Sequence, residues 1–196
     1  MNYENLKSNL NEIIEGPKLI QPSVYKDDRG FFYETWNKEK FNNLINKKVE
    51  FFQDNHSKSS FSVLRGLHYQ LPPYQQGKLV RCIKGKIFDV AVDLRKSSRT
   101  YKQWIGVYLD DLNKSLFWIP EGFAHGFLTL SKEAEILYKA TSPWNKTKER
   151  TIFWKDIDLK INWPLKEIEF SNPILSNKDN QGQSLKDVIK NDDIFL

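Results

Sequence analysis

Three histidines are the residues of this sequence best suited to proton transfer or to metal binding. His56, His68 and His125 are its only imidazoles. Each lies in a segment that is dense in polar and aromatic side chains. An imidazole has an ordinary pKa of about 6.5, so near neutral pH it can serve as an acid, a base or a neutral ligand. The setting of each histidine therefore decides which chemistry is open to it.

His68 lies in an expected β-strand that ends near Gln70. Side chains of a strand alternate between its two faces. This alternation predicts one face with Leu64, Gly66, His68 and Gln70, and an opposite face with Arg65 and Leu67. An imidazole that points into a barrel could be a catalyst or a hydrogen-bonded structural residue. The strand pattern alone leaves both roles open.

His125 follows Pro120 and Gly122 in a Pro-x-Gly-x-x-His pattern that resembles the second motif of the cupin jelly rolls. In metal-binding cupins this histidine joins a His-x-His pair and a carboxylate from the first motif. Here the residue two positions after His68 is Gln70, so one imidazole of the pair is missing. Two histidines are too few for a strong metal site. We therefore predict no metal, which leaves both histidines free to act as acids, bases or substrate ligands.

The strands that must position these side chains fill the middle of the sequence. Over residues 86–94 apolar residues recur at every second position, which predicts a half-buried strand with Asp89 and Asp93 on the less apolar face. Lys84-Gly85 separates it from an expected strand over 78–83, and a glycine there favours a tight hairpin turn. Further strands are expected over 63–69, 104–109, 116–119, 124–130, 134–140 and 151–154. Short strands at such intervals predict an all-β sandwich or barrel.

Helical patterning is weak and peripheral. It is limited to residues 38–45 and 184–190. A chain of 196 residues suits one domain with a sizeable core. We expect a single domain over residues 1–196, with an N-terminal extension at 1–15. Polar residues and prolines in the last part of the chain predict a segment, 164–196, that wraps the surface of the sheets.

Composition and charge narrow the classes of partner. The 30 Lys and Arg residues exceed the 25 Asp and Glu residues, but they are scattered, so nucleic-acid binding is not indicated and a phosphorylated small molecule explains the balance as well. The single cysteine, Cys82, cannot form an intrachain disulfide, which favours a reducing compartment. No apolar stretch approaches the roughly 20 residues of a membrane-spanning helix. We expect a cytoplasmic protein with no membrane partner.

Over residues 16–179 the sequence resembles the dTDP-4-dehydrorhamnose 3,5-epimerase family. The resemblance is carried by ordered segments at 28–34, 53–57, 63–70, 76–81, 88–95, 119–127, 137–139 and 175–179. It implies an all-β, cupin-type antiparallel jelly roll with a few short helices, usually a homodimer, without a metal or an organic cofactor. The implied reaction converts dTDP-4-dehydro-6-deoxy-D-glucose to dTDP-4-dehydro-L-rhamnose, in dTDP-L-rhamnose biosynthesis, by epimerisation at carbons 3 and 5 through enolates.

The resemblance also implies roles for four catalytic residues. His68 is the implied base and Tyr138 the implied acid, and their ordinary pKa values of about 6.5 and about 10 suit those roles near neutral pH. Asp179 is the implied carboxylate that orients the histidine and stabilises its charged form. Lys78 is implied to lie near the ketone oxygen, where a fixed positive charge stabilises the enolate.

A further set of residues is implied to bind the substrate. It comprises Arg29, Glu34, Gln53, Asp54, Asn55, Arg65, Lys78, His125, Glu149 and Lys178. Phe31 and Phe32 could sandwich the thymine, and for Phe31 an ordinary core aromatic is the alternative. Two alternatives stay open at this point: an epimerase of one carbon only or of another nucleotide-linked 4-keto sugar, and a non-catalytic sugar-binding cupin. Loss of the base or the acid would be the sign of the latter, and the sequence retains both.

Overall fold

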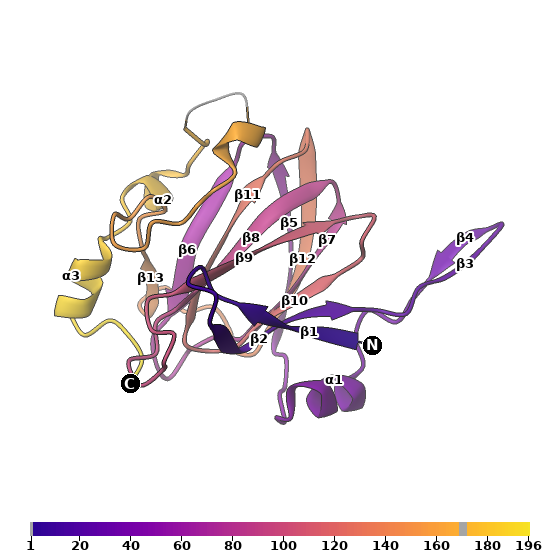
Figure 1. The fold of residues 1–196 in the computed structure, drawn as a ribbon, viewed down its shortest axis with the longest axis horizontal. Coiled ribbons are helices and arrows are strands. Elements are labelled where there is room, and N and C mark those ends of the chain that lie inside the picture. The colour runs from indigo at the N-terminus through magenta and orange to yellow at the C-terminus, as the bar shows by residue number, and fades with distance from the viewer. Residues whose placement is uncertain (1, 169–171) are drawn as a thin grey trace.

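The chain folds into two antiparallel sheets that pack face to face (Figure 1). The computed structural model describes residues 2–168 and 172–196. The larger sheet has the strand order β1-β2-β10-β7-β12-β5 and the smaller one the order β13-β6-β11-β8-β9. The all-β sandwich expected from the spacing of the strands is confirmed.

The bounds of the elements are as follows. The larger sheet contains β1 (Asn2–Lys7), β2 (Ile13–Gln21), β5 (Gln53–Ser60), β7 (Lys78–Lys84), β10 (Leu116–Ile119) and β12 (Glu133–Ala140). The smaller sheet contains β6 (Leu64–Gln70), β8 (Lys86–Asp93), β9 (Trp104–Asp110), β11 (Phe123–Thr129) and β13 (Glu149–Thr151). Outside both sheets lie the hairpin β3 (Tyr25–Asp27) and β4 (Gly30–Phe32), the helices α1 (Lys38–Ile45), α2 (Asn177–Asn180) and α3 (Leu185–Lys190), and a 3₁₀ turn at Leu165–Glu167.

Three apolar clusters hold these layers together. The central one lies between the sheets and includes Val80, Phe117 and Ile136 from the larger sheet and Ile87 and Ala91 from the smaller. A second cluster packs α1 on the outer face of the larger sheet. A third covers the outer face of the smaller sheet with the C-terminal part of the chain. Each fully buried Leu, Ile or Phe side chain contributes roughly 1.5–3 kcal/mol, so all three clusters matter for stability.

The third cluster corrects the expectation of a half-buried strand over 86–94. Val90 faces the C-terminal segment and Ala91 faces the core between the sheets, and both are fully buried. The strand is therefore covered on both faces. A sandwich lacking an outer layer would have exposed one of them, but residues that follow β13 cover it here, among them Trp163, whose ring lies 6.0 Å from that of Phe88. Part of this cover comes from residues before 164 such as Leu159 and Trp163, and residues 169–171 of the expected wrapping segment lie outside the described residues.

The expected hairpin at Lys84-Gly85 is also corrected. β7 pairs with β10 and β12, whereas β8 pairs with β11 and β9, so the chain passes from one sheet to the other at Gly85. Gly85 has a φ of 77°, and a Cβ atom there would lie 2.1 Å from the carbonyl oxygen of Glu133. Glycine is thus required at position 85. Its role is to let the chain change sheets, not to form a hairpin.

Alternation fails in β6 near Gly66. The register of β6 against β11 shifts between the pairs His125–His68 and Phe127–Arg65. The extra residue places Arg65 and His68 on the same inner side, although simple alternation placed them on opposite faces. Gly66 has a φ of 129°, and a Cβ atom there would lie 2.5 Å from the Cα of Gly126. This close approach of two backbones requires glycine at position 66.

Other elements agree with the sequence in part. The helices expected over 38–45 and 184–190 are confirmed as α1 and α3. The strand expected over 151–154 is instead β13, which ends at Thr151 because Phe153 bonds to Gln183 of the C-terminal segment. Residues 2–7 of the expected N-terminal extension form an edge strand of the larger sheet. No helix among the described residues is long and apolar enough to cross a membrane.

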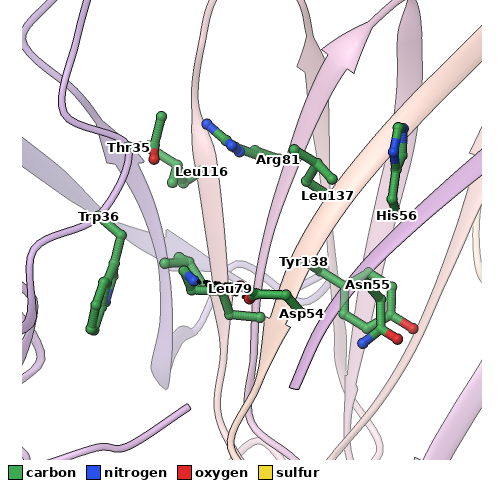
Figure 2. Close-up of a pocket in the computed structure, with 11 residues that line it drawn as sticks. Thr35, Trp36, Asp54, Asn55, His56, Leu79, Arg81, Leu116, Leu137 and Tyr138 are labelled. Atoms are coloured by element: carbon green, nitrogen blue, oxygen red, sulfur yellow. Dashed lines mark hydrogen bonds and ion pairs between the residues drawn. The ribbon is translucent and has the colours of Figure 1, made fainter. Parts of the chain in front are cut away.

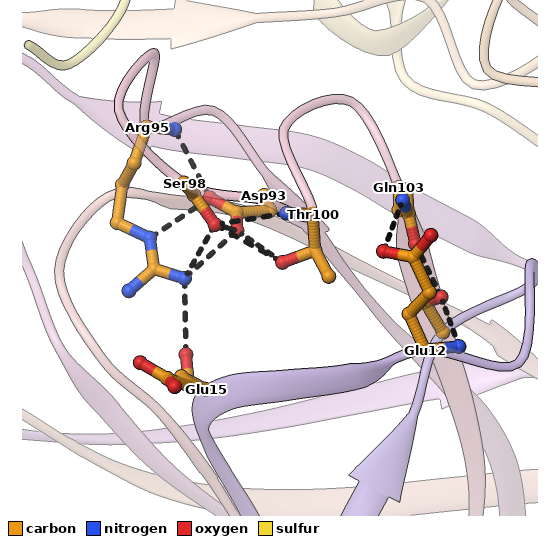
Figure 3. A network of polar contacts seen from close by, with 8 residues as sticks. Glu12, Glu15, Asp93, Arg95, Ser98, Thr100 and Gln103 are labelled. Carbon is orange, nitrogen blue, oxygen red and sulfur yellow. Dashed lines mark hydrogen bonds and ion pairs between the residues drawn. The ribbon is translucent and has the colours of Figure 1, made fainter.

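A buried polar network ties one end of the sandwich together (Figure 3). The fully buried carboxylate of Asp93 accepts hydrogen bonds from Arg95 (2.7 Å and 2.8 Å), Ser98 (2.6 Å) and Thr100 (2.8 Å). Arg95 also donates to the carbonyl oxygen of Glu15 in β2, at 3.0 Å. The network therefore links the loop after β8, in the smaller sheet, to the larger sheet.

Candidate active site

A cavity of about 550 Å³ lies between the two sheets, next to the central apolar cluster. Its walls draw on seven elements and the loops beside them. The lining residues are Gln53, Asn55, Ser57, Arg65, His68, Gln76, Lys78, His125, Phe127, Ile136, Tyr138, Trp144, Glu149, Ser176, Lys178 and Asp179. A concave site with an apolar floor and converging polar groups suits a small polar ligand. Both His68 and His125 face this interior cavity.

His68 and Asp179 form the first of two His–Asp pairs in this cavity. Nε2 of His68 lies 2.5 Å from Oδ1 of Asp179, whose side chain is 3% exposed. Burial lowers the pKa of His68, and the charges of Lys178 and Lys78 lower it further, while Asp179 raises it. The net pKa lies below the ordinary value, so His68 is a neutral imidazole near neutral pH. A neutral imidazole that is hydrogen-bonded to a carboxylate has the properties of a general base.

The segment around α2 carries Asp179 to His68 and is held on both sides by backbone hydrogen bonds. Before α2, the amide of Ile174 bonds to the carbonyl of Ser62 at 2.8 Å. After α2, the amide of Gln183 bonds to the carbonyl of Thr151 at 2.9 Å. These contacts fix a short helix against the edge of the smaller sheet. They explain how a carboxylate so far along the chain reaches the cavity.

His125 and Asp89 form the second His–Asp pair. Nε2 of His125 lies 2.6 Å from Oδ1 of Asp89, and the Asp89 side chain is fully buried. Oδ2 of Asp89 has no hydrogen-bond partner among the described residues. The sequence indicated the face on which Asp89 lies but gave it no part in the site. The sequence signal for Asp89 was a carboxylate in the middle of a largely apolar strand, where an ionisable group needs a partner.

Lys78 supplies a positive charge at the cavity wall. Burial lowers the pKa of Lys78 to about 8, although the charges of Asp89 and Glu149 oppose this fall. The ammonium is therefore still protonated in most molecules at neutral pH. Such a group can stabilise an oxyanion that forms on a bound ligand.

Tyr138 faces the cavity from the wall opposite His68. Tyr138 belongs to β12 of the larger sheet, while His68 belongs to β6 of the smaller sheet. Burial raises the pKa of Tyr138, the charge of Glu149 raises it further, and Arg65 partly offsets both. The phenol thus keeps its proton at neutral pH. The cavity has a proton acceptor on one wall and a proton donor on the other.

Polar side chains at the edge of the cavity contact one another. Arg65 is anchored to β5 through Ser59 Oγ at 2.9 Å. Glu149 and Lys178 form an ion pair at 3.0 Å. Asn55 accepts a hydrogen bond from Gln53 at 2.7 Å, but its own Nδ2 has no partner among the described residues. Asn55 therefore has a free donor for a ligand in the cavity.

Three residues implied as substrate contacts lie elsewhere in this chain. Asp54 is on the outer face of β5, where it pairs with Lys139 at 3.0 Å in a groove beside Trp36 (Figure 2). The reason is strand alternation, which turns Asp54 away from the cavity that its neighbours Gln53 and Asn55 line. Arg29 pairs with Asp27 at 2.6 Å on the β3–β4 hairpin, and Glu34 bonds to Lys40 at 3.0 Å beside α1.

The described residues contain no cluster of three His, Cys, Asp or Glu side chains with the spacing of a metal site. Gln70, which stands where metal-binding cupins have the second histidine, donates to the carbonyls of Tyr74 and Pro143 at 2.6 Å and 3.1 Å. Its side-chain oxygen accepts from the amide of Asn145 at 2.6 Å. Gln70 is thus a structural residue, and the absence of a metal from the reaction stays a prediction.

Comparisons with known proteins place this geometry among nucleotide-sugar epimerases. The sequence model of the dTDP-4-dehydrorhamnose 3,5-epimerase family matches residues 11–187. A dTDP-4-dehydrorhamnose 3,5-epimerase of Shigella flexneri is 54% identical over 169 residues, which cover 86% of this chain and 91% of the relative.

Two solved structures are similar over nearly the whole chain. The Legionella pneumophila epimerase in complex with dTDP-4-keto-L-rhamnose has a TM-score of 0.87 and 41% identity, and the match covers 99% of this chain and 98% of that one. A Mycobacterium tuberculosis epimerase has a TM-score of 0.92 and 35% identity, and the match covers 100% and 94% of the two chains.

Proposed function

Because the chain belongs to the dTDP-4-dehydrorhamnose 3,5-epimerase family, we propose that His68 and Tyr138 exchange protons with opposite faces of a dTDP-linked 4-keto-6-deoxy sugar bound in the cavity. The reaction of the family is an isomerisation at carbons 3 and 5. The observation that carries our assignment is that the base and the acid project from opposite sheets into one cavity.

Each inversion needs the removal of a proton from one face of the sugar and its return to the other. His68 removes the proton beside the ketone, and the electron pair of the broken C–H bond passes to the ketone oxygen as an enolate. Lys78 stabilises this oxygen with its positive charge. Tyr138 then donates its proton to the opposite face of the same carbon. His68 must lose the proton it has taken, and Tyr138 must regain one, before the second carbon reacts.

The remaining cavity residues hold the substrate. Arg65 is suited to the diphosphate, because its planar guanidinium engages two oxygens at once. Asn55, through its free Nδ2, and His125 are suited to the sugar or the nucleotide. Gln53, Glu149 and Lys178 complete the polar edge. The contribution of Asp54 stays a prediction, since its side chain faces the outer groove.

Arg29 lies outside the cavity of its own chain and would reach a bound substrate only in a homodimer. The β3–β4 hairpin projects from the body of the fold (Figure 1), with Phe31 57% and Phe32 72% exposed. A pair of exposed aromatic residues is a typical contact with a partner. We propose that a second copy covers the hairpin and receives Arg29 near its own cavity. Sedimentation should show a dimer, and an active wild-type monomer would contradict the proposal. Glu34, at the base of the hairpin, is assigned to the same contact.

We also place the enzyme in the cytoplasm. Its single cysteine, Cys82, is buried and forms no disulfide, so an oxidising compartment offers it no stabilisation. Fractionation of cells that produce the enzyme would test this.

Deuterium incorporation from heavy water tests the reaction most directly. Wild-type enzyme should place solvent deuterium at carbons 3 and 5 of a dTDP-4-keto-6-deoxy sugar, as read by NMR. Deuterium at one carbon only would identify a single-site epimerase. A tightly bound sugar that takes up no deuterium would identify a binding protein instead of an enzyme.

A further inference from the structure

The chain uses the same local motif twice, once inside the active site and once outside it. Ser176 and Asp179 begin α2, and Ser184 and Asp187 begin α3, in two Ser-x-x-Asp segments. In both, the serine is the N-cap and its Oγ accepts from the aspartate amide, at 3.2 Å and 3.1 Å. In both, the serine Oγ also lies close to Oδ2 of the aspartate, at 2.8 Å and 2.7 Å.

The two motifs differ in the other carboxylate oxygen. Oδ1 of Asp179 binds Nε2 of His68, whereas Asp187 is exposed and contacts no histidine. In α2 each oxygen of a nearly fully buried carboxylate therefore has its own partner, one a serine hydroxyl and the other an imidazole.

The hydroxyl of Ser176 has only one proton, and the carboxylate has none to give. Since an ionised carboxylate only accepts, Ser176 must donate to Oδ2, and its lone pair accepts the amide of Asp179. Ser176 thus makes two hydrogen bonds. The one it accepts fixes the start of the helix, and the one it donates fixes the rotation of the carboxylate. For the same reason Nε2 of His68 carries its proton, and Nδ1 keeps the lone pair that a base needs.

We propose that Ser176 is a positioning residue for proton abstraction, because its hydroxyl orients the Asp179 carboxylate and thereby selects the base form of His68. The inference rests on the proposed role of His68 as the base. Without the hydroxyl, the carboxylate can rotate about its Cβ–Cγ bond and lose its alignment with Nε2. The imidazole then populates both neutral tautomers, and only one of them presents Nδ1 as the base.

The experiment compares three variants at positions that share one local structure. Ser176→Ala removes the cap and the carboxylate contact in the active site. Ser184→Ala removes the same two contacts on α3, away from the cavity. Ser176→Thr keeps a hydroxyl at the first position. Should Ser176→Ala fail to fold, Ser176→Gly replaces it, since glycine is a tolerated N-cap without a hydroxyl.

Two measurements are made on each variant. Steady-state kinetics should show kcat lowered about tenfold for Ser176→Ala with KM changed less than twofold, because a hydrogen bond to a charged group is lost while the substrate contacts remain. ¹⁵N NMR of labelled histidine, with the His68 signals assigned from a His68→Asn variant, should show a mixture of tautomers in place of one. Ser176→Thr should restore both readings, and Ser184→Ala should leave both at the wild-type level.

Either of two results would overturn the proposal. The first is a Ser176→Ala enzyme with wild-type kcat and a single tautomer of His68. The second is an equal loss in Ser184→Ala, which would show that the caps act through helix stability alone. Because the tautomer is measured without substrate, a failure here remains distinct from a failure of the proposed reaction, which would appear as absent deuterium uptake in the wild type.

Discussion

The two His–Asp pairs of the cavity are alike in chemistry and different in construction. His68 and His125 are directly opposite each other on β6 and β11, and each bonds through Nε2 to a carboxylate at 2.5 Å or 2.6 Å. The partner of His125 is Asp89, on the neighbouring strand β8. The partner of His68 is Asp179, which comes from a short helix outside the sheets.

The two pairs also differ in the exposure of the histidine and in the hydrogen bonds of its carboxylate partner. The His68 side chain is 23% exposed and the His125 side chain is 9% exposed. Both oxygens of Asp179 accept hydrogen bonds, whereas one oxygen of Asp89 has no partner among the described residues, and the charge of Asp89 acts on Lys78. We infer that His68, held by Asp179, takes up protons from the substrate. His125 and Asp89 position the substrate, and Asp89 raises the pKa of Lys78.

The two pairs should differ most when each histidine is replaced. His68→Asn should lower solvent deuterium exchange into the substrate by about 10²–10⁴-fold, since without the base no enolate forms. His125→Asn should mainly raise KM and slow exchange much less. Parallel exchange assays on the two variants measure the contrast. Near-normal exchange in His68→Asn would reverse the assignment.

Replacing the carboxylate of the first pair should have the next largest effect. Asp179→Asn should slow exchange by about 10- to 100-fold, because a hydrogen bond to a charged group is lost. Asp179 raises the pKa of His68, so its removal lowers that pKa further. The neutral base is present above this pKa, and the acid limb of the pH–rate profile should move to lower pH. A limb that moves to higher pH would contradict the assignment.

The carboxylate of the second pair should govern the opposite limb of the profile. Lys78 stabilises the enolate only when protonated, so activity should fall as the pH rises through its pKa of about 8. Asp89 raises this pKa, and Asp89→Asn should move the basic limb to lower pH with a loss of rate of about tenfold or less at neutral pH. A pH–rate profile of kcat/KM checks this, and a shift of the acid limb alone would show that Asp89 acts elsewhere.

Removing the acid opposite His68 should change exchange less than it changes inversion. In Tyr138→Phe the base is intact, so a proton can leave and return on the same face while inversion falls. The Phe ring keeps most of the volume of the Tyr ring, which limits repacking. Exchange and inversion are measured on one sample by NMR. A loss of exchange that equals the loss in His68→Asn would make Tyr138 part of the abstraction step.

Chelation should have the smallest effect of all. Both imidazoles bond to carboxylates through Nε2, and Gln70 bonds to three backbone groups. Activity should therefore stay within experimental error after dialysis against EDTA. If a divalent ion restored activity lost on chelation, the two histidines would have to be reassigned as metal ligands.

Much of the strand content could be predicted, and the exceptions have physical reasons. Strands such as β10 coincide with apolar runs in the sequence, because their side chains are buried in the core. β5, Gln53–Ser60, carries no large apolar residue, because its inner side lines the polar cavity and it is the edge of its sheet. In the sequence, β5 was indicated only by the segment 53–57 that it shares with the family. The change of side at Gly66 depends on Gly126, which alternation within one strand cannot reveal.

The site was predictable to the extent that the family resemblance named its residues. Among them, His68, Lys78, Tyr138 and Asp179 line one cavity. Asp89 was missed as a partner, because its bond to His125 depends on the register of β8 against β11. Ser176 was missed because a serine before a short helix is an ordinary cap, and only its carboxylate contact sets it apart. The placement of Arg29 on an exposed hairpin could not follow from one chain's sequence.

The separation of 111 residues between His68 and Asp179 has a consequence for the order of folding. Asp179 is also made after every strand of both sheets, the last of which, β13, ends at Thr151. Both sheets can be complete before the segment around α2 docks on the edge of the smaller one. A newly made chain can thus complete its sandwich first and orient its base last. Return of activity during refolding would therefore report the final docking step, after the spectroscopic signal of the sheets has recovered.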